Sequence, residues 1–185
     1  MTWVDRVPQA EPITPAGTRR GWLQSVAARP DRNVTSVKYE TLVRAPLEAT
    51  FAFFSDASNL ERLTPEWLQF SIATPAPIVM RAGLQIDYRI RLHGVPLAWS
   101  SEIDVWEPGR RFVDRQVAGP YLWWRHEHRF EAAGGATRVI DEVEYLPRAA
   151  WMTARMVRRD VERIFRYRQD ALQRIFDPPA LASHA

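Results

Sequence analysis

The chain has no cysteine among its 185 residues. This absence excludes disulfide bonds, thiolate zinc sites and a cysteine nucleophile. No stretch approaches the roughly 20 apolar residues that a membrane span needs, and the N-terminus lacks the apolar run of about 7 or more residues found in secretory signals. We therefore expect a cytoplasmic protein without a transmembrane segment.

Lysine is nearly absent, since 24 of the 25 basic residues are arginine, and the net charge is only +3. Residues 151–176 carry seven basic and three acidic side chains. A solvated helix face is the simplest interpretation, and a surface for nucleic acid or an anionic membrane is the alternative. Clustered basic runs interleaved with aromatics are missing. We therefore do not expect nucleic-acid binding, and peripheral membrane contact remains open.

The hydrophobic fraction of 46% and the eight tryptophans are ample for a folded core, and the length suits one domain. Residues 1–34 hold four prolines and show no sustained hydrophobic period. We expect an irregular extension over residues 1–34, one domain over residues 35–177 and a short tail over residues 178–185.

Hydrophobic spacing predicts a strand, two short helices and then a series of strands. The segment "TSVKYETLV" at 35–43 alternates as a half-buried strand does. Pro46 is well placed to begin a helix, and "DASNLERLTP" predicts a second short helix, which Asp56 or Ser58 caps and Pro65 ends. Five further alternating runs follow, joined by the compact turns "HGVP", "EPGR", "AGPY" and "AAGGAT".

The last predicted element is one long amphipathic helix over residues 151–176, with apolar side chains at three- and four-residue steps. Pro178 and Pro179 end it. The element order predicts an α+β fold in which a curved, seven-stranded antiparallel sheet wraps this helix. Because such a sheet does not fill the space beneath it, we expect a cavity between sheet and helix.

Residues 35–176 resemble the SRPBCC superfamily, the helix-grip fold of START lipid-transfer domains and aromatic polyketide cyclases. The segments "NLERLTPEWLQF", "FVDRQVAGPYLWWRHEHRF" and "RVIDEVEYLP" resemble a bacterial branch of uncharacterised proteins labelled cyclase/dehydrase. The resemblance implies the fold more firmly than the function, because this fold carries many chemistries and much plain binding.

The positions of the turns predict how the strands pair. They place Val105 opposite Phe112, Ile103 opposite Asp114, and Tyr88 and Ile90 opposite Ser101 and Trp99. They also pair Gln116 with Trp124, Asp114 with His126, His128 with Asp141, and Phe130 with Val139. Both histidines of "WWRHEHRFEA" then lie on the concave face, each beside its own aspartate, while Trp123, Arg125, Glu127 and Arg129 lie outside.

Three interpretations of these His–Asp pairs stay open. They can be structural contacts within the sheet, they can orient a bound ligand, or they can act as a general acid and base. The catalytic candidates are His126, His128, Asp114 and Asp141. The same side chains suit a metal ion, but a carboxylate beside each histidine accounts for both rings, so we expect neither a metal nor another cofactor.

The function we expect from the sequence is binding of a small hydrophobic or amphipathic molecule in the cavity. The candidate ligand-binding residues are Tyr88, Ile90, Trp99, Ser101, Phe112, Gln116, Trp124, Tyr145, Val161, Phe165 and Arg168. We expect Arg168, on the apolar face of the long helix, to meet a buried carboxylate such as Asp141 or Asp114. The alternatives are a cyclase- or dehydratase-type enzyme and an RNA- or membrane-associated interaction module. The sequence leaves the ligand and the oligomeric state open.

Overall fold

The computed structural model describes residues 25–26, 28–30 and 33–177. Most of the predicted extension and the whole predicted tail lie outside these residues. The sheet has seven strands in the order β1-β7-β6-β5-β4-β3-β2, and each neighbouring pair is antiparallel. The strands are β1 Thr35–Val43, β2 Ser71–Ile72, β3 Gln85–Leu92, β4 Val95–Glu107, β5 Arg111–Ala118, β6 Tyr121–Ala133 and β7 Ala136–Pro147.

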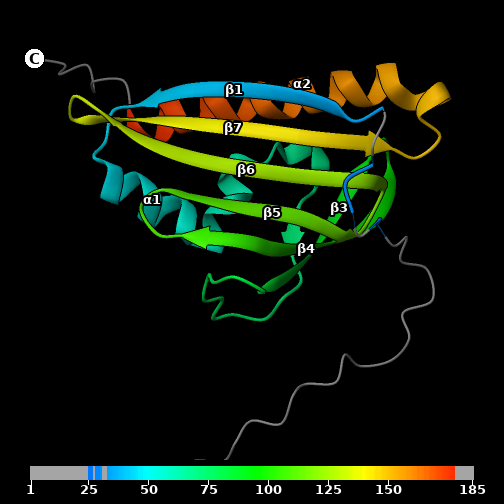
Figure 1. Ribbon diagram of the computed structural model, residues 1–185, viewed down its shortest axis with the longest axis horizontal. Coiled ribbons are helices and arrows are strands. Elements are labelled where there is room, and N and C mark those ends of the chain that lie inside the picture. The colour runs from blue at the N-terminus through cyan, green and yellow to red at the C-terminus, as the bar shows by residue number, and fades with distance from the viewer. Residues whose placement is uncertain (1–24, 27, 31–32, 178–185) are drawn as a thin grey trace, which may run out of the picture.

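The long C-terminal helix α2, Ala150–Phe176, runs behind β1 and β7 in Figure 1. Its buried side chains include Val157, Val161, Phe165 and Leu172. Burial of each such side chain stabilises the fold by about 1.5–3 kcal/mol. The curved seven-stranded sheet and its helix confirm the predicted α+β architecture. Among the described residues, no helix is long and apolar enough to cross a membrane.

The two short helices after β1 differ in type. The first, α1, spans Leu47–Ser55 and begins after Pro46. The second predicted helix is a 3-10 segment, η1 Ala57–Leu63, which Asp56 caps by accepting a hydrogen bond of 2.9 Å from the Ser58 amide. A further 3-10 turn, η2 Glu66–Leu68, follows Pro65. Because η1 contacts α2 and η2 contacts β3, these turns help to enclose the space beneath the sheet.

The pairing of the central strands confirms the predicted register at the functional candidates. Asp114 lies opposite His126 and Ile103, and His128 lies opposite Asp141. Phe130 also pairs with Val139 as predicted. The register therefore brings both histidines and both aspartates to the concave face.

The register prediction is wrong at two places. A bulge between Ile103 and Val105 moves Val105 opposite Val113 instead of Phe112. The β3–β4 hairpin pairs Tyr88 with Trp99 and Ile90 with Leu97, two residues from the predicted register. The physical reason is a tight turn of only His93 and Gly94, both with positive φ. A shift of two residues keeps each side chain on its face. The predicted Gln116–Trp124 pair lies beyond the paired part of β5 and β6, which ends at Arg115 and Arg125.

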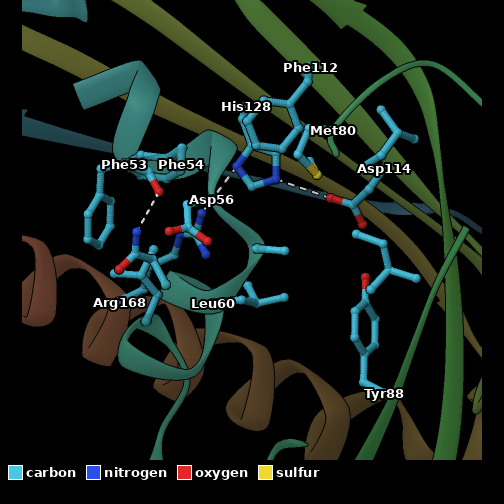
Figure 2. A pocket seen from close by; sticks show the side chains of 15 residues that line it. Phe53, Phe54, Asp56, Leu60, Met80, Tyr88, Phe112, Asp114, His128 and Arg168 are labelled. Atoms are coloured by element: carbon cyan, nitrogen blue, oxygen red, sulfur yellow. Dashed lines mark hydrogen bonds and ion pairs between the residues drawn. The ribbon is translucent and has the colours of Figure 1, made fainter. Parts of the chain in front are cut away.

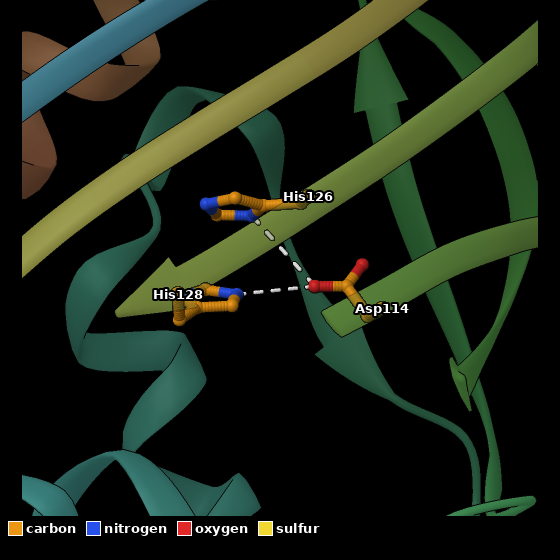
Figure 3. Close-up of side chains that lie close together, drawn as sticks. All are labelled: Asp114, His126 and His128. Carbon is orange, nitrogen blue, oxygen red and sulfur yellow. Dashed lines mark hydrogen bonds and ion pairs between the residues drawn. The ribbon is translucent and has the colours of Figure 1, made fainter. Parts of the chain in front are cut away.

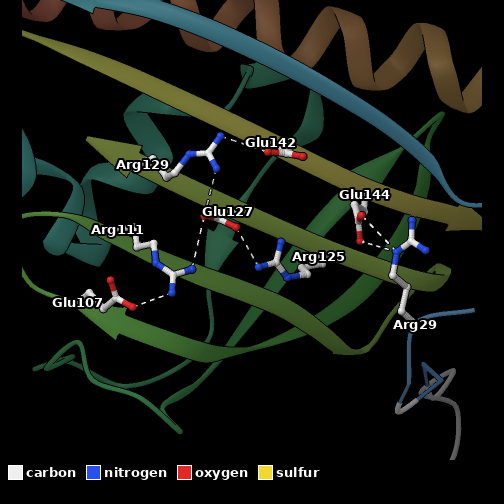
Figure 4. Close-up of polar contacts among 8 residues, drawn as sticks. All are labelled: Arg29, Glu107, Arg111, Arg125, Glu127, Arg129, Glu142 and Glu144. Carbon is white, nitrogen blue, oxygen red and sulfur yellow. Dashed lines mark hydrogen bonds and ion pairs between the residues drawn. The ribbon is translucent and has the colours of Figure 1, made fainter. Parts of the chain in front are cut away.

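The opposite face of the sheet carries cross-strand ion pairs (Figure 4). Glu127 of β6 contacts Arg111 of β5 at 3.5 Å, and Arg129 of β6 reaches Glu142 of β7 at 3.2 Å. Glu127 also contacts Arg125 of the same strand at 2.9 Å. Arg125, Glu127 and Arg129 lie outside the concave face as predicted, but Glu127 and Trp123, which also lies on β6, are buried. The ion pairs connect β6 with β5 and β7, so they favour the correct strand pairing.

Of three apolar clusters among the described residues, one lies around Ile86 and Tyr88 of β3, and the other two border the middle of β5, β6 and β7. Of these two, one contains Phe51, Phe54, Phe112, Phe130 and Leu172, and the other contains Tyr121, Val143, Tyr145, Val161 and Phe165. Polar side chains from the middle of β5, β6 and β7 lie between these two clusters, and they form the candidate site.

Candidate functional site

Five polar residues form the centre of the site. Asp114 comes from β5, His126 and His128 from β6, Asp141 from β7 and Arg168 from α2. His126, His128, Asp141 and Arg168 are each at most 6% exposed, and Asp114 is half-buried. We call these five residues the central cluster. Strand alternation puts the first four on one face, and a step of 3 to 4 residues from Phe165 and Leu172 puts Arg168 on the buried face of α2.

Each histidine contacts both aspartates. His126 Nε2 lies 2.8 Å from Asp141 Oδ1, and His128 Nε2 lies 3.1 Å from Asp114 Oδ2. The other ring nitrogens reach the other carboxylates, since His126 Nδ1 is 3.7 Å from Asp114 Oδ2 and His128 Nδ1 is 3.1 Å from Asp141 Oδ1. The prediction that each histidine has its own aspartate is therefore wrong. The reason is that the rings lie against one another, with centroids 3.7 Å apart, so each ring bridges β5 and β7.

Arg168 supplies the positive charge of the central cluster. Its Nε lies 3.4 Å from Asp141 Oδ2, and its Nη2 lies 3.2 Å from His128 Nδ1. The guanidinium also lies over the Phe54 ring, 5.1 Å from the centroid. The expectation that Arg168 meets a buried carboxylate is thus confirmed for Asp141.

These contacts shift the pKa values of three groups. Burial alone would raise the pKa of Asp141, but the Arg168 guanidinium and hydrogen bonds from both histidines hold it well below its usual range. In the same way, contacts with His128 and His126 outweigh burial and lower the pKa of Asp114. Burial, reinforced by the proximity of His128, lowers the pKa of His126 to about 4, and the hydrogen bond to Asp141 opposes this only in part. At neutral pH both carboxylates are therefore ionised and the His126 ring is neutral.

A cavity of about 170 Å³ adjoins the central cluster and is bounded by the sheet, the 3-10 turns and α2. Asp114, His126, His128 and Arg168 lie on its wall. So do six further residues that the sequence singled out for ligand binding: Tyr88, Ile90, Trp99, Ser101, Trp124 and Phe165. A smaller cavity of about 60 Å³ lies on the α1 side of the same cluster (Figure 2). Asp114, His128 and Arg168 line both cavities, so the central cluster lies where the two meet.

Four of the predicted ligand-binding residues are not on the wall of the larger cavity. Phe112 lines the smaller one and stacks on His128, with centroids 4.1 Å apart. Tyr145 and Val161 belong to the second apolar cluster. Gln116 holds the β5–β6 turn, since its Nε2 donates to the Tyr121 carbonyl at 2.9 Å and contacts the Ser25 hydroxyl. Asp141, a catalytic candidate, lies behind the two histidines and lines neither of these cavities.

Several wall residues were missed by the sequence reasoning. They come mostly from the 3-10 turns and the segment after them, with others from the ends of β3 and β6, the β5–β6 turn and α2: Leu60, Leu63, Thr64, Leu68, Phe70, Leu92, Pro120, Tyr121, Asp160 and Ile164. The apolar residues of "NLERLTPEWLQF" carried a usable signal, because their spacing around Pro65 indicates a short segment that is buried on one side. The 3-10 form and its position opposite β3 are tertiary features that the spacing does not reveal.

Aromatic rings form one side of the larger cavity. Trp99 meets Trp124 edge-on, with centroids 5.2 Å apart, and Tyr121 lies 4.9 Å from Trp124. The Trp99 Nε1 donates to the Ser101 hydroxyl at 3.0 Å, which fixes the orientation of the indole. Burial raises the pKa of the Tyr88 hydroxyl, so this group stays a neutral hydrogen-bonding partner. The cavity thus has an aromatic and aliphatic wall and a polar end.

Residues 90–176 match the family described as "Domain of unknown function (DUF8410)". No curated protein sequence matches the chain.

Similar solved structures come from bacteria and plants. The Zhui aromatase/cyclase of a Streptomyces species has a TM-score of 0.61 at 17% identity, over 80% of this chain and 100% of that one. A Chromobacterium violaceum protein has a TM-score of 0.61 at 14% identity, over 77% of this chain and 97% of that one. Major latex-like protein 151 of Panax ginseng has a TM-score of 0.58 at 10% identity, over 78% of this chain and 99% of that one. At these identities the likeness concerns the fold alone, and the chain has the helix-grip fold that the sequence resemblance implied.

Proposed function

We propose that the protein binds a small, mostly apolar molecule in the cavity between the sheet and α2. The observation that carries this proposal is the cavity of about 170 Å³ with an aromatic wall and one polar end. Cavities on the order of 150 Å³ accommodate a benzene-sized ring. Binding sites for small molecules combine such apolar walls with a few polar groups that fix orientation. The ligand therefore has a ring-sized apolar body and one polar group.

The polar end sets the orientation of this ligand. Asp114, His126, His128 and Arg168 line the cavity and already contact one another. The Tyr88 and Ser101 side chains lie on the same wall, from β3 and β4. A ligand group placed here exchanges hydrogen bonds with fixed partners, while its apolar body packs against Trp99, Trp124 and the leucines of the 3-10 turns.

Filling the cavity tests ligand binding. In Ile90→Trp the larger side chain enters the cavity wall, and we expect binding of the probe 1-anilinonaphthalene-8-sulfonate to weaken about 10-fold or more, which corresponds to about 1.4 kcal/mol. Fluorescence titration measures the affinity, and native mass spectrometry of the purified protein detects any molecule that remains bound. Leu42→Trp is the matched control, because Leu42 is an exposed aliphatic residue on β1. Equal probe binding by both variants, together with a chain that carries no bound mass, would refute the proposal.

A second candidate function is a cyclase- or dehydratase-type reaction on a ketone-bearing substrate. Two observations favour it: the similarity to an aromatase/cyclase structure, and the position of His126 and His128 on the cavity wall beside carboxylates. Positioned acids and bases contribute about 100- to 10,000-fold to such reactions.

The enzyme hypothesis predicts a loss of turnover that is separate from a loss of binding. With a linear β-polyketone as substrate, His126→Ala and His128→Ala are expected to lower turnover about 100-fold or more, a much larger factor than the loss of affinity for the anilinonaphthalene probe. Leu42→Trp again serves as the control. Unchanged turnover in both histidine variants rules out a catalytic role for these rings.

A further inference from the structure

Three donor atoms of the central cluster converge on one point beside the larger cavity. His126 Nδ1 lies 3.7 Å and His128 Nε2 lies 3.1 Å from Asp114 Oδ2, and all three atoms are within 4.8 Å of one another. Figure 3 shows both rings turned towards the Asp114 carboxylate. Ligands that bind zinc at 2.0–2.2 Å lie roughly 3.0–3.5 Å apart. The observed spacing therefore needs only small adjustments to hold an ion.

We propose that Asp114, His126 and His128 form a binding site for a first-row divalent metal ion such as zinc or ferrous iron. Two imidazole nitrogens and one carboxylate, with no thiolate, suit this class of ion. All three residues line the larger cavity. An ion held by three protein groups there keeps at least one coordination position open towards the cavity, as in metal sites that bind substrates.

Asp141 supports this site from behind the rings. Its Oδ1 lies 2.8 Å from His126 Nε2 and 3.1 Å from His128 Nδ1. When these two nitrogens carry the protons, the opposite nitrogens present their lone pairs to the ion. A carboxylate that accepts from the far side of a histidine is the usual support of a metal-binding imidazole. Here one carboxylate serves both rings, which leaves Asp114 free to act as the third ligand.

The contact between His128 Nδ1 and Asp141 Oδ1 also makes Arg168 compatible with the ion. In one tautomer His128 Nδ1 accepts from Arg168 Nη2 at 3.2 Å, and in the other it donates to Asp141 Oδ1. Metal binding selects the second tautomer, and Arg168 keeps its ion pair with Asp141 at 3.4 Å. From the sequence we expected no metal, because a separate aspartate beside each histidine accounted for both rings. In the structure Asp141 serves both histidines, so Asp114 is available to an ion.

Formal charges indicate which ligand group the ion would bind. Asp114, Asp141 and Arg168 together carry one negative charge, and a divalent ion with neutral histidines changes the sum to one positive charge. A carboxylate, enolate or phenolate entering from the cavity would neutralise it, and buried charges are favourable only when balanced. This choice of ligand group rests on the proposed ligand binding, but the metal site itself does not.

The test uses the full-length, untagged chain after treatment with a chelator. Isothermal titration with Zn²⁺ alone and visible absorption with Co²⁺ alone are expected to show one tightly bound ion. We expect His126→Ala and His128→Ala each to weaken Zn²⁺ binding at least 100-fold, and Asp141→Asn to weaken it about 10- to 100-fold through loss of the supporting carboxylate. His93→Ala is the matched control, because His93 is exposed and pairs with Asp160 instead.

Circular dichroism shows whether each variant is folded, and Asp114→Asn replaces any histidine variant that is not. A folded wild-type chain that binds neither ion overturns the proposal, as does Zn²⁺ binding that persists in the site variants or falls equally in His93→Ala. Metal binding without any binding of the anilinonaphthalene probe would refute the ligand-binding proposal and leave the metal site standing. Probe binding without metal binding would refute the metal site and leave the ligand-binding proposal standing.

Discussion

Replacing Arg168 with methionine is expected to lower the free energy of unfolding by about 3–5 kcal/mol. Arg168 is 6% exposed and Asp141 is 2% exposed, so water cannot take over the role of the guanidinium. Methionine fills a similar volume and keeps the packing against Phe54, but it leaves Asp141 ionised without its cationic partner. Urea denaturation followed by circular dichroism at pH 7 measures the loss.

Two further variants show whether the loss of stability comes from the Asp141 carboxylate that is left without its cationic partner. Arg166→Met replaces an arginine that is exposed on the same helix, and we expect it to change stability by less than about 1 kcal/mol. Asp141→Asn combined with Arg168→Met removes both charges, so the double variant is expected to lose less than the sum of the single losses. A loss below about 1 kcal/mol in Arg168→Met would mean that the pair behaves like a surface ion pair.

Strand parity predicted which side chains of the central strands lie on the concave face of the sheet. His126 and His128 are two residues apart, so they share a face in any register, and the turns brought Asp114 and Asp141 to the same level. The error at the β3–β4 hairpin did not matter for the face of Tyr88, because the shift was two residues. Because side chains alternate between the two faces of a sheet, a register error of two residues still assigns each side chain to the correct face.

Other features depend on contacts that no sequence pattern encodes. Gln116 has the parity of a cavity residue, yet its amide is used by the backbone of the β5–β6 turn, where a Cβ at Gly119 would collide with it. Both histidines share Asp141 because their rings lie against one another in a tilted contact, which strand pairing alone does not determine. The arrangement of these rings, more than their identity, is what makes both ligand binding and metal binding plausible chemistry for the cluster.

The position of the central cluster also has a physical explanation. It lies between two apolar clusters, one around Phe54 and Phe112 and the other around Tyr145 and Phe165. Buried polar groups are costly unless every one is paired, and here each charged or ring group has partners within the cluster. The stability of the domain is therefore coupled to the protonation of the same residues that line the cavity.

This coupling predicts that the metal-free protein loses stability as the pH falls from about 6.5 to about 4. Histidine in an unfolded chain titrates near pH 6.5, whereas burial lowers the pKa of His126 to about 4 in the folded protein. Between these values the unfolded state binds more protons, so the free energy of unfolding decreases with decreasing pH. At about 1.4 kcal/mol per pKa unit, the full change is on the order of 3 kcal/mol.

Asp114 and Asp141 extend the loss to lower pH. Their pKa values are lowered in the folded state, so their contribution to stability is present above the unfolded pKa of about 3.9 and is lost as the pH falls through the folded pKa.

Urea unfolding between pH 7.5 and pH 4.5, in the presence of a chelator, measures how the free energy of unfolding changes with pH in the interval where His126 titrates. His126→Gln keeps a donor for Asp141 but does not titrate, and it is expected to flatten the curve over this interval. His93→Gln replaces an exposed histidine and is expected to leave the pH dependence of the free energy of unfolding unchanged. A wild-type curve without slope, or the same slope in His126→Gln, would show that His126 is not the group that couples folding to pH.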